Sequence, residues 1–234
     1  MARRTPDDRF DQLIDAATQV FIEQGYRRTQ MADIADAMGV AKGTLYLAVE
    51  SKEALFDLAC RWADAPRPLP RPDVLPVPTP PPGATLAYVG ERLAREAAVP
   101  LLAAAVTRTR VRDPGAELGA IVGEIYDVLA RNRRGLKLID RSARDMPELA
   151  ALWFEGARGG FVALLGRYLE ARLRRGHFRP VPDLAAATRL VLELIVFWAV
   201  HRHWDAHPDP IEESTAKATV IRFVTGALVE EERA

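Results

Sequence analysis

Residues 29–56 read TQMADIADAMGVAKGTLYLAVESKEALF. Apolar residues recur at helical spacing on both sides of a short polar group, Lys42-Gly43-Thr44, which stands at the head of a brief helical segment. A hydrophobic core does not require a lysine, a glycine and a threonine at such a place. The stretch therefore predicts a surface that is shaped to contact another molecule.

Two short helices joined by a glycine-containing turn are expected within this stretch. The first covers about residues 31–38 and ends at Gly39, and the second covers about residues 41–47. Together they have the spacing of a helix-turn-helix unit (about residues 30–49). In such a unit the first helix supports the second, whose N-terminal residues enter the major groove of DNA.

The polar residues of this region have the chemistry that a DNA duplex requires. Lys42 can meet a phosphate, and Gly43 lets another backbone approach closely because it has no Cβ. Thr44 offers a hydroxyl and a methyl group to a base edge or a phosphate. Tyr46 has a phenolic donor at the rim, and Lys52, in the first turn of the next helix, can reach the sugar-phosphate backbone.

The longer stretch GYRRTQMADIADAMGVAKGTLYLAVESKEALF (residues 25–56) resembles the DNA-binding domain of the TetR/AcrR family of bacterial repressors. The resemblance covers about residues 7–62. It implies an all-α transcriptional regulator that acts as a homodimer on a near-palindromic operator and responds to a small effector. The residues expected at the DNA are Arg28, Thr29, Gln30, Ala41, Lys42, Gly43, Thr44, Tyr46 and Lys52.

A proline-rich segment, PRPLPRPDVLPVPTPPPG at residues 66–83, predicts the domain boundary. Proline at this density removes amide donors and restricts φ, so neither helix nor sheet should persist there. We expect a spacer or surface arm, which is favoured over a ligand for adaptor domains. It separates an N-terminal DNA-binding domain (residues 1–65) from a C-terminal domain for effector binding and dimerisation (residues 84–234).

The rest of the chain reads as helix throughout, and no strand alternation is present. The predicted fold class is therefore all-α in two domains. The further helices are expected at about residues 84–111 (bent at Pro100), 116–132, 135–144, 148–175, 183–205 and 212–231.

The run TRLVLELIVFWAVHRHW at residues 188–204 is apolar almost all the way round, so a helix here is expected to be buried on more than one side. The next helix resembles the second member of the family's dimerisation pair. A homodimer is favoured over a core within a single chain. The expected interface residues are Leu192, Ile195, Val196, Ala199, Val220, Val224 and Leu228.

Glycines in the segment around residues 148–175 lower its helix propensity, which indicates either close helix packing or space kept free. The two interpretations are evenly balanced. The family resemblance implies a pocket for a small, largely apolar effector in this domain. The candidate pocket residues are Tyr126, Trp153, Phe154, Gly156, Gly159, Phe161 and Trp198.

Composition and missing motifs limit the other function classes. The 234 residues carry no net charge and a single cysteine, which excludes an intrachain disulfide. No signal peptide is recognised, and the apolar run at residues 190–200 is too short to span a bilayer, so a cytoplasmic protein is expected. No catalytic motif is found, and no cofactor is expected.

The sequence also allows two alternatives, a metal site and a function with weak or lost DNA binding. His203 and His207 have a spacing that could place two metal ligands on one helix face, but polar histidines at a helix end are favoured and no metal is expected. A sensor or interaction protein with weak or lost DNA binding is the rival function. It is supported by the excess of acidic over basic residues before residue 61 and by Leu47-Ala48-Val49, where the family has aromatic residues.

Overall fold

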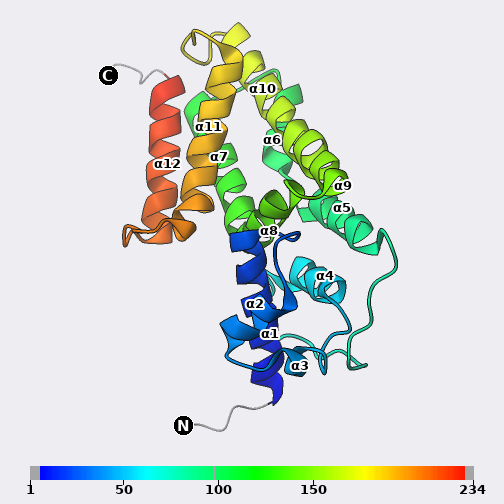
Figure 1. The fold of residues 1–234 in the computed structure, drawn as a ribbon. Coiled ribbons are helices and arrows are strands. Elements are labelled where there is room, and N and C mark those ends of the chain that lie inside the picture. The colour runs from blue at the N-terminus through cyan, green and yellow to red at the C-terminus, as the bar shows by residue number, and fades with distance from the viewer. Residues whose placement is uncertain (1–5, 97, 230–234) are drawn as a thin grey trace. The chain divides into compact units, whose positions relative to one another are not determined.

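In the computed structural model, residues 6–96 and 98–229 are described, and within them the chain forms helices joined by loops (Figure 1). These residues contain no β-strand, only an isolated bridge between Val49 and Val77, which confirms the all-α prediction. The helices are α1 (Pro6–Gln24), α2 (Met31–Met38), α3 (Lys42–Leu45), α4 (Lys52–Trp62), α5 (Ala84–Glu96), α6 (Pro100–Thr107), α7 (Pro114–Arg131), α8 (Arg133–Ala143), α9 (Pro147–Ala150), the π-helix η1 (Ala151–Arg158), α10 (Gly159–Arg174), α11 (Leu184–Ala199), the 3₁₀-helix η2 (His201–Trp204) and α12 (Glu213–Leu228).

The chain divides into two compact units. Of the described residues, the first unit takes 6–95 and 132–155, and the second takes 96, 98–131 and 156–229. Helices α8 and α9 and nearly all of α5 therefore lie in the first unit, although the expected boundaries placed them in the C-terminal domain. Contacts between residues far apart in the sequence cause this difference.

The first unit is built around α1. Leu13, Ile14, Ala17 and Phe21 follow helical spacing on α1 and are buried. Helices α2, α4 and α8 surround this stripe. Phe21 meets Phe56 of α4 edge to face, with ring centroids 5.2 Å apart. This core holds the helix-turn-helix against α1.

The second unit is a bundle of α6, α7, α10, α11 and α12 with an apolar core. A charged group lies within it: Arg172 of α10 is fully buried, and its Nε donates to Glu117 of α7 at 2.7 Å. The Arg172 guanidinium also donates to the carbonyl of Ala105 in α6 at 2.8 Å. A buried charge with this many partners connects three helices and is not free for a ligand.

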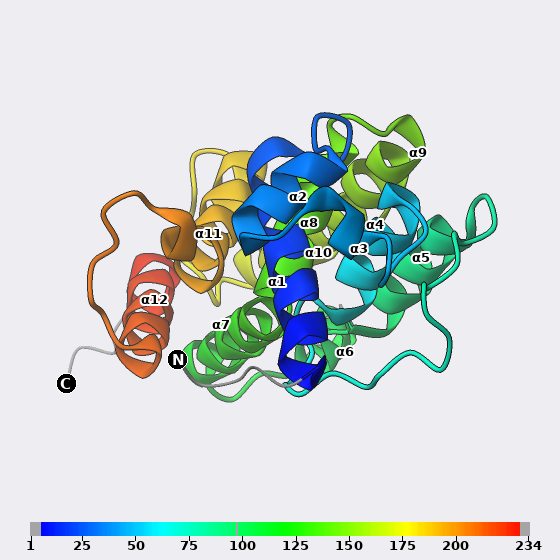
Figure 2. The ribbon, with the colours of Figure 1, turned by 60° about the horizontal axis from the view of Figure 1, so that its bottom comes forward.

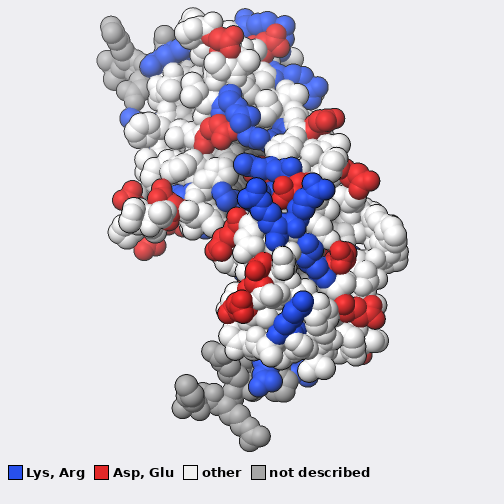
Figure 3. Space-filling view, viewed as in Figure 1, with Lys and Arg blue, Asp and Glu red and all other residues white. Residues whose placement is uncertain are grey.

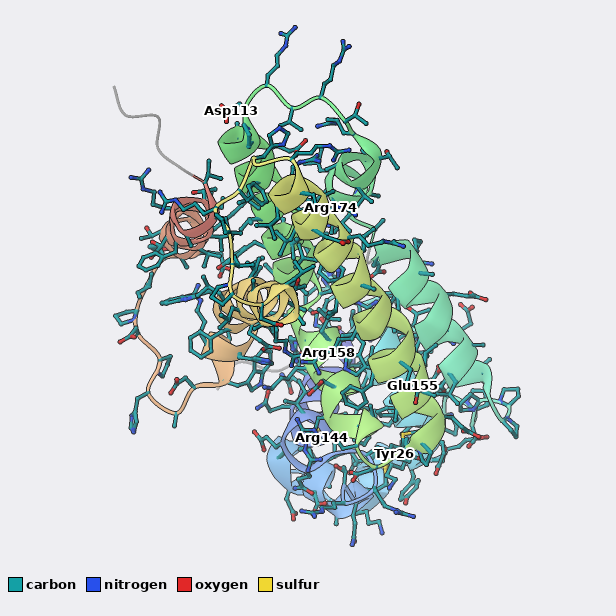
Figure 4. The ribbon with its side chains drawn as sticks, turned by 90° about the horizontal axis from the view of Figure 1, so that it is seen from above. Tyr26, Asp113, Arg144, Glu155, Arg158 and Arg174 are labelled. Atoms are coloured by element: carbon teal, nitrogen blue, oxygen red, sulfur yellow. The ribbon has the colours of Figure 1, made fainter. Side chains whose placement is uncertain are left out.

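Two expected helices differ in detail from the structure. The helix expected at 84–111 is broken rather than bent, because Val99, the residue before Pro100, has a non-helical backbone and Pro100 begins α6. The helix expected at 148–175 is continuous from Pro147 to Arg174 but includes the wider π turns of η1. Figure 4 shows Glu155 and Arg158 on this run and Arg174 at its far end.

The run Pro147–Arg174 is also long and apolar enough to cross a membrane by length and composition. Single helices in soluble proteins meet the same criterion, so this feature alone does not define a membrane span. The run carries Glu155 and Arg158 near its middle, and Arg158 donates to Glu193 of α11 at 3.1 Å. We therefore describe its α10 part as a helix of the bundle.

Candidate nucleic-acid interface

The short helix α3 presents its polar residues to solvent. Leu45 is its buried residue and anchors it to the core, whereas Lys42, Gly43 and Thr44 are exposed. A Cβ added to Gly43 would meet no atom within 4 Å, so the surface beside it is open. Gly39, at φ 66°, ends α2 and forms the turn into α3 (Figure 2). The structure therefore has the geometry of a helix-turn-helix with an accessible second helix.

Two of the expected DNA-contacting residues, at the start of α2, have different surroundings. Thr29 is fully buried, and its hydroxyl donates to the carbonyl of Gly25 at 2.8 Å. It braces the loop and does not reach the surface, which corrects the expectation of a DNA contact. Gln30 is exposed, and its backbone N–H donates to the Asp33 carboxylate at 2.7 Å, which stabilises the first turn of α2.

Lys52 has an intrachain role that the sequence did not indicate. Its ammonium donates to the carbonyls of Tyr26 and Thr29, each at 3.0 Å, and lies 4.4 Å from the centroid of the Tyr26 ring. Burial, together with the Glu53 carboxylate that accepts the phenol's hydrogen bond at 2.9 Å, raises the pKa of Tyr26. Lys52 thus joins α4 to the loop before α2 (Tyr26 is labelled in Figure 4).

The remaining expected contacts lie on the surface. Ala41 and Arg28 are exposed, and Tyr46 is 41% exposed. Leu47 follows and is 73% exposed, which is unusual for a leucine side chain. A cation, a hydroxyl and a phenol are therefore available along and beside α3.

A second element lies next to this helix, and the sequence did not predict its contact there. The proline-rich segment, residues 66–83, runs as an extended chain past α3 before it reaches α5 (Figure 1). Its Val77 forms the isolated bridge with Val49, directly after α3. Proline density correctly predicted the absence of a helix, but it contained no signal for this contact.

Basic side chains also gather over α8 in the view of Figure 3. Several have acidic partners in the same unit: Arg134 pairs with Asp15 at 2.7 Å, and Arg144 pairs with Asp140 at 3.5 Å. The carboxylates thus neutralise part of this cluster. A solvated face fits these contacts better than an anion site.

The expected pocket residues are divided between the two units. Trp153 and Phe154 belong to the first, where the Trp153 indole donates to Asp140 at 3.0 Å. Tyr126 in the second unit is buried, and its hydroxyl donates to Glu213 at 2.8 Å. The second unit also contains Gly156, Gly159, Phe161 and Trp198.

Most of the expected dimer residues lie inside the second unit. Leu192, Ile195, Ala199, Val220, Val224 and Leu228 belong to its core, and Val196 is half-buried. This corrects the choice of face, because side chains buried in their own chain cannot meet a partner. The large apolar side chains that α11 and α12 expose are Leu190, Phe197 and Phe223. Beside Phe223, a shallow hollow on α12 is lined by Ser214, Thr215, Ala218, Thr219 and Arg222.

No cluster of three metal-ligating side chains occurs within residues 6–96 and 98–229. His203 faces Glu213, with 3.4 Å between Nε2 and Oε2. His201 and His203 belong to η2 at the end of α11, and His207 follows in a loop.

The fold and the exposed second helix define a helix-turn-helix domain. Residues 13–59 match the family model for bacterial regulatory proteins of the tetR family. Residues 13–59 of this chain are therefore similar to regulatory proteins of the tetR family.

Curated relatives match about a fifth of this chain. The fatty acid metabolism regulator protein of Bacillus subtilis is 47% identical over 48 residues, which cover 20% of this chain and 25% of the relative. The repressor KstR2 of Rhodococcus jostii is 46% identical over 46 residues, or 20% of this chain and 22% of the relative. The activator FasR of Mycolicibacterium smegmatis is 44% identical over 50 residues. The chain thus matches about a quarter of these relatives' length.

Solved structures resemble the whole chain in fold. The ketosteroid transcriptional regulator KstR2 of Mycobacterium tuberculosis has a TM-score of 0.53 at 18% identity, covering 98% of this chain and 99% of that one. SCO3833 of Streptomyces coelicolor, a TetR regulator, has a TM-score of 0.54 at 22% identity, covering 98% and 94%. At such identities the likeness shows a shared fold.

Proposed function

We propose that this protein is a sequence-specific DNA-binding transcriptional regulator that has no catalytic activity and acts in the cytoplasm. The observation that carries the proposal is the open surface of α3, where Lys42, Gly43 and Thr44 project from a helix held to the core by Leu45. Such a surface fits the major groove, with Lys42 at a phosphate and Thr44 near a base edge. A repressor and an activator are both among the matched relatives, so their names support either mode of regulation. We propose repression because the family that the N-terminal sequence resembles consists of repressors.

Selection of bound sequences from a random DNA pool tests this function. We expect a near-palindromic sequence whose half-sites are centred roughly 34 Å or more apart. With that sequence, Lys42→Ala should weaken binding to all duplexes and reduce the salt slope by about one unit. Thr44→Ala should instead change the base preference, at roughly 1–3 kcal/mol for a good contact. If no sequence is enriched, the protein is a sensor without DNA binding.

We further propose that a small, largely apolar effector binds the C-terminal region and weakens DNA binding. The apolar helices of the second unit support this role, and so do the names of matched relatives, which refer to fatty acids and ketosteroids. A thermal-shift screen with fatty acids and steroids tests it. Gly159→Leu should abolish the response to a hit while leaving the oligomeric state unchanged, and equal binding by this variant would place the site elsewhere.

A further inference from the structure

We propose that the proline-rich segment, here called the proline strap (residues 66–83), is a positioning element for DNA recognition. Its residues 77–79 hold the turn that follows α3, and so set the orientation in which α3 meets a duplex. This inference rests on the proposed DNA-binding function. It assigns a role to a segment that would otherwise be a spacer.

The strap is joined to the turn by a run of hydrogen bonds. The amide of Val77 donates to the carbonyl of Ala48 at 2.8 Å, and the amide of Glu50 donates back to the carbonyl of Val77 at 3.0 Å. The amide of Thr79 donates to the Glu50 carboxylate at 2.9 Å. A short parallel pairing therefore forms between the strap and the chain directly after the recognition helix.

The strap also meets the cap of the next helix. The Ser51 hydroxyl accepts from the amide of Ala54 at 3.1 Å and so caps α4. The same hydroxyl forms a hydrogen bond with the hydroxyl of Thr79 at 2.8 Å. The side chain that begins α4 is thus shared between its own helix and the strap, so the strap constrains both ends of the turn between α3 and α4.

The helix α3 is short and buries the side chain of Leu45 alone. It comprises four residues, its N-cap Ala41 makes no side-chain cap, and Leu45 is its buried residue. The next apolar side chain, Leu47, is 73% exposed and contributes little packing. Val49, by contrast, is fully buried and pairs with Val77. Leu45 and the strap-bound turn are therefore the local anchors of the recognition helix.

The N-terminal part of the strap is fixed as well. The amide of Leu69 donates to the Asp11 carboxylate of α1 at 3.0 Å, and the Leu69 side chain is buried. Arg67 forms an ion pair with Asp15, also on α1, at 2.5 Å. Because the strap is attached to α1 at one end and to the turn at the other, it can transmit the rigidity of α1 to the turn after α3.

Two substitutions remove strap contacts without touching α3. Val77→Pro deletes the amide that donates to Ala48 but keeps the carbonyl and suits an already proline-rich chain. Thr79→Val removes the hydroxyl that meets Ser51 and keeps the shape. Val74→Pro, at the exposed tip of the strap, is the matched proline control. Thr79→Ser restores a hydroxyl and serves as the conservative variant.

The experiment measures DNA affinity on the selected sequence together with hydrogen exchange at the Glu50 amide. We expect the double variant Val77→Pro/Thr79→Val to exchange this amide faster and to bind DNA about tenfold more weakly. Val74→Pro and Thr79→Ser should behave like the wild type in both measurements. The melting temperature controls for global unfolding.

Two results would overturn the inference. One is faster exchange at Glu50 with an affinity within about twofold of the wild type, since the turn would then be loose without consequence. The other is an equal loss of affinity in Val74→Pro, which would mean that the strap contacts DNA directly. A wild-type protein that binds no duplex instead refutes the proposed function, and the wild-type measurement alone decides this.

Discussion

Lys42 and Lys52 lie in the same helix-turn-helix region, yet their surroundings differ. Lys42 is exposed on α3, whereas Lys52 donates to two backbone carbonyls and lies over the Tyr26 ring. The residue types and spacing predicted phosphate contacts for both. They could not distinguish the two because a carbonyl partner 23 or 26 residues away becomes a neighbour only after folding.

This difference predicts that alanine substitution lowers stability at Lys52 and weakens DNA binding at Lys42. Lys52→Ala should lower the free energy of unfolding by about 1–2 kcal/mol, because two carbonyls lose a charged donor that is partly buried. Lys42→Ala should leave stability within about 0.5 kcal/mol and weaken DNA binding instead. Urea unfolding of the two variants checks the contrast. Equal stability of both would show that the Lys52 contacts contribute nothing measurable.

A substitution at Leu47 is expected to raise the affinity for DNA. Its side chain is 73% exposed, so a ring placed there should not disturb the core. Leu47→Tyr supplies the aromatic group that the family has in this region and should tighten binding without altering base preference. Titration of the selected duplex and of a scrambled duplex measures both quantities. An unchanged affinity would mean that position 47 does not lie near a phosphate.

At the scale of elements, α4 and α8 are joined by a single carboxylate. Asp64, just after α4, accepts from the amides of Arg134 and Gly135 at 2.8 and 2.9 Å, and so caps α8 from outside. The Arg92 guanidinium of α5 donates to the same carboxylate at 3.0 Å. These contacts add to the packing of α8 on α1 and α4 within the first unit, a grouping that helical periodicity along the chain could not reveal.

The close approach of Asp64 requires a glycine in α8. A Cβ at Gly135 would lie 2.6 Å from the Asp64 Oδ2 atom, so Gly135→Ala should lower the free energy of unfolding by about 1–2 kcal/mol despite the better helix propensity of alanine. Gly160→Ala in α10 is the control, since nothing lies within 4 Å of its added Cβ. That variant should be more stable by up to ~1 kcal/mol. A stabilised Gly135→Ala in thermal unfolding would show that Asp64 moves aside at no cost.

In the second unit, the ionisation of Glu117 makes the free energy of unfolding depend on pH. Burial raises the pKa of Glu117, but the hydrogen bonds and charges of Arg172 and Arg108 outweigh it and hold the pKa below its ordinary value. The stabilisation is therefore present above pH ~4.3 and is lost as the pH falls through the lower folded-state pKa. Glu117→Gln should flatten this part of the stability profile. A profile of the same slope in both proteins would contradict the assignment.

At the scale of the whole molecule, the apolar residues of α11 and α12 lie on two faces, one buried and one exposed. Val224 belongs to the core, whereas Leu190 and Phe223 are 72% and 68% exposed. Large apolar side chains at this exposure favour an interface with a second chain. Sequence periodicity assigned the core face of these helices to the partner, because an all-apolar helix does not indicate which side its own bundle covers.

Phe223→Glu should therefore yield folded monomers, because it places a charge on the exposed face only. Val224→Glu should unfold the second unit, because it buries an unpaired charge. Sedimentation and circular dichroism separate the two outcomes at micromolar concentration. A wild-type protein that sediments as a monomer would remove the basis for a homodimer through this face.

The sequence by itself determined the features that depend on neighbours along the chain. These are the all-α class, the helix-turn-helix with Gly39 at its turn, and the loss of regular structure across residues 66–83. Only the tertiary structure decided which polar groups are buried and which helices share a unit. Lys52 and the strap residue Val77 acquire their roles from partners that folding brings to hydrogen-bond distance. Local propensity and periodicity act within a few residues, whereas these partners are selected by packing across the fold.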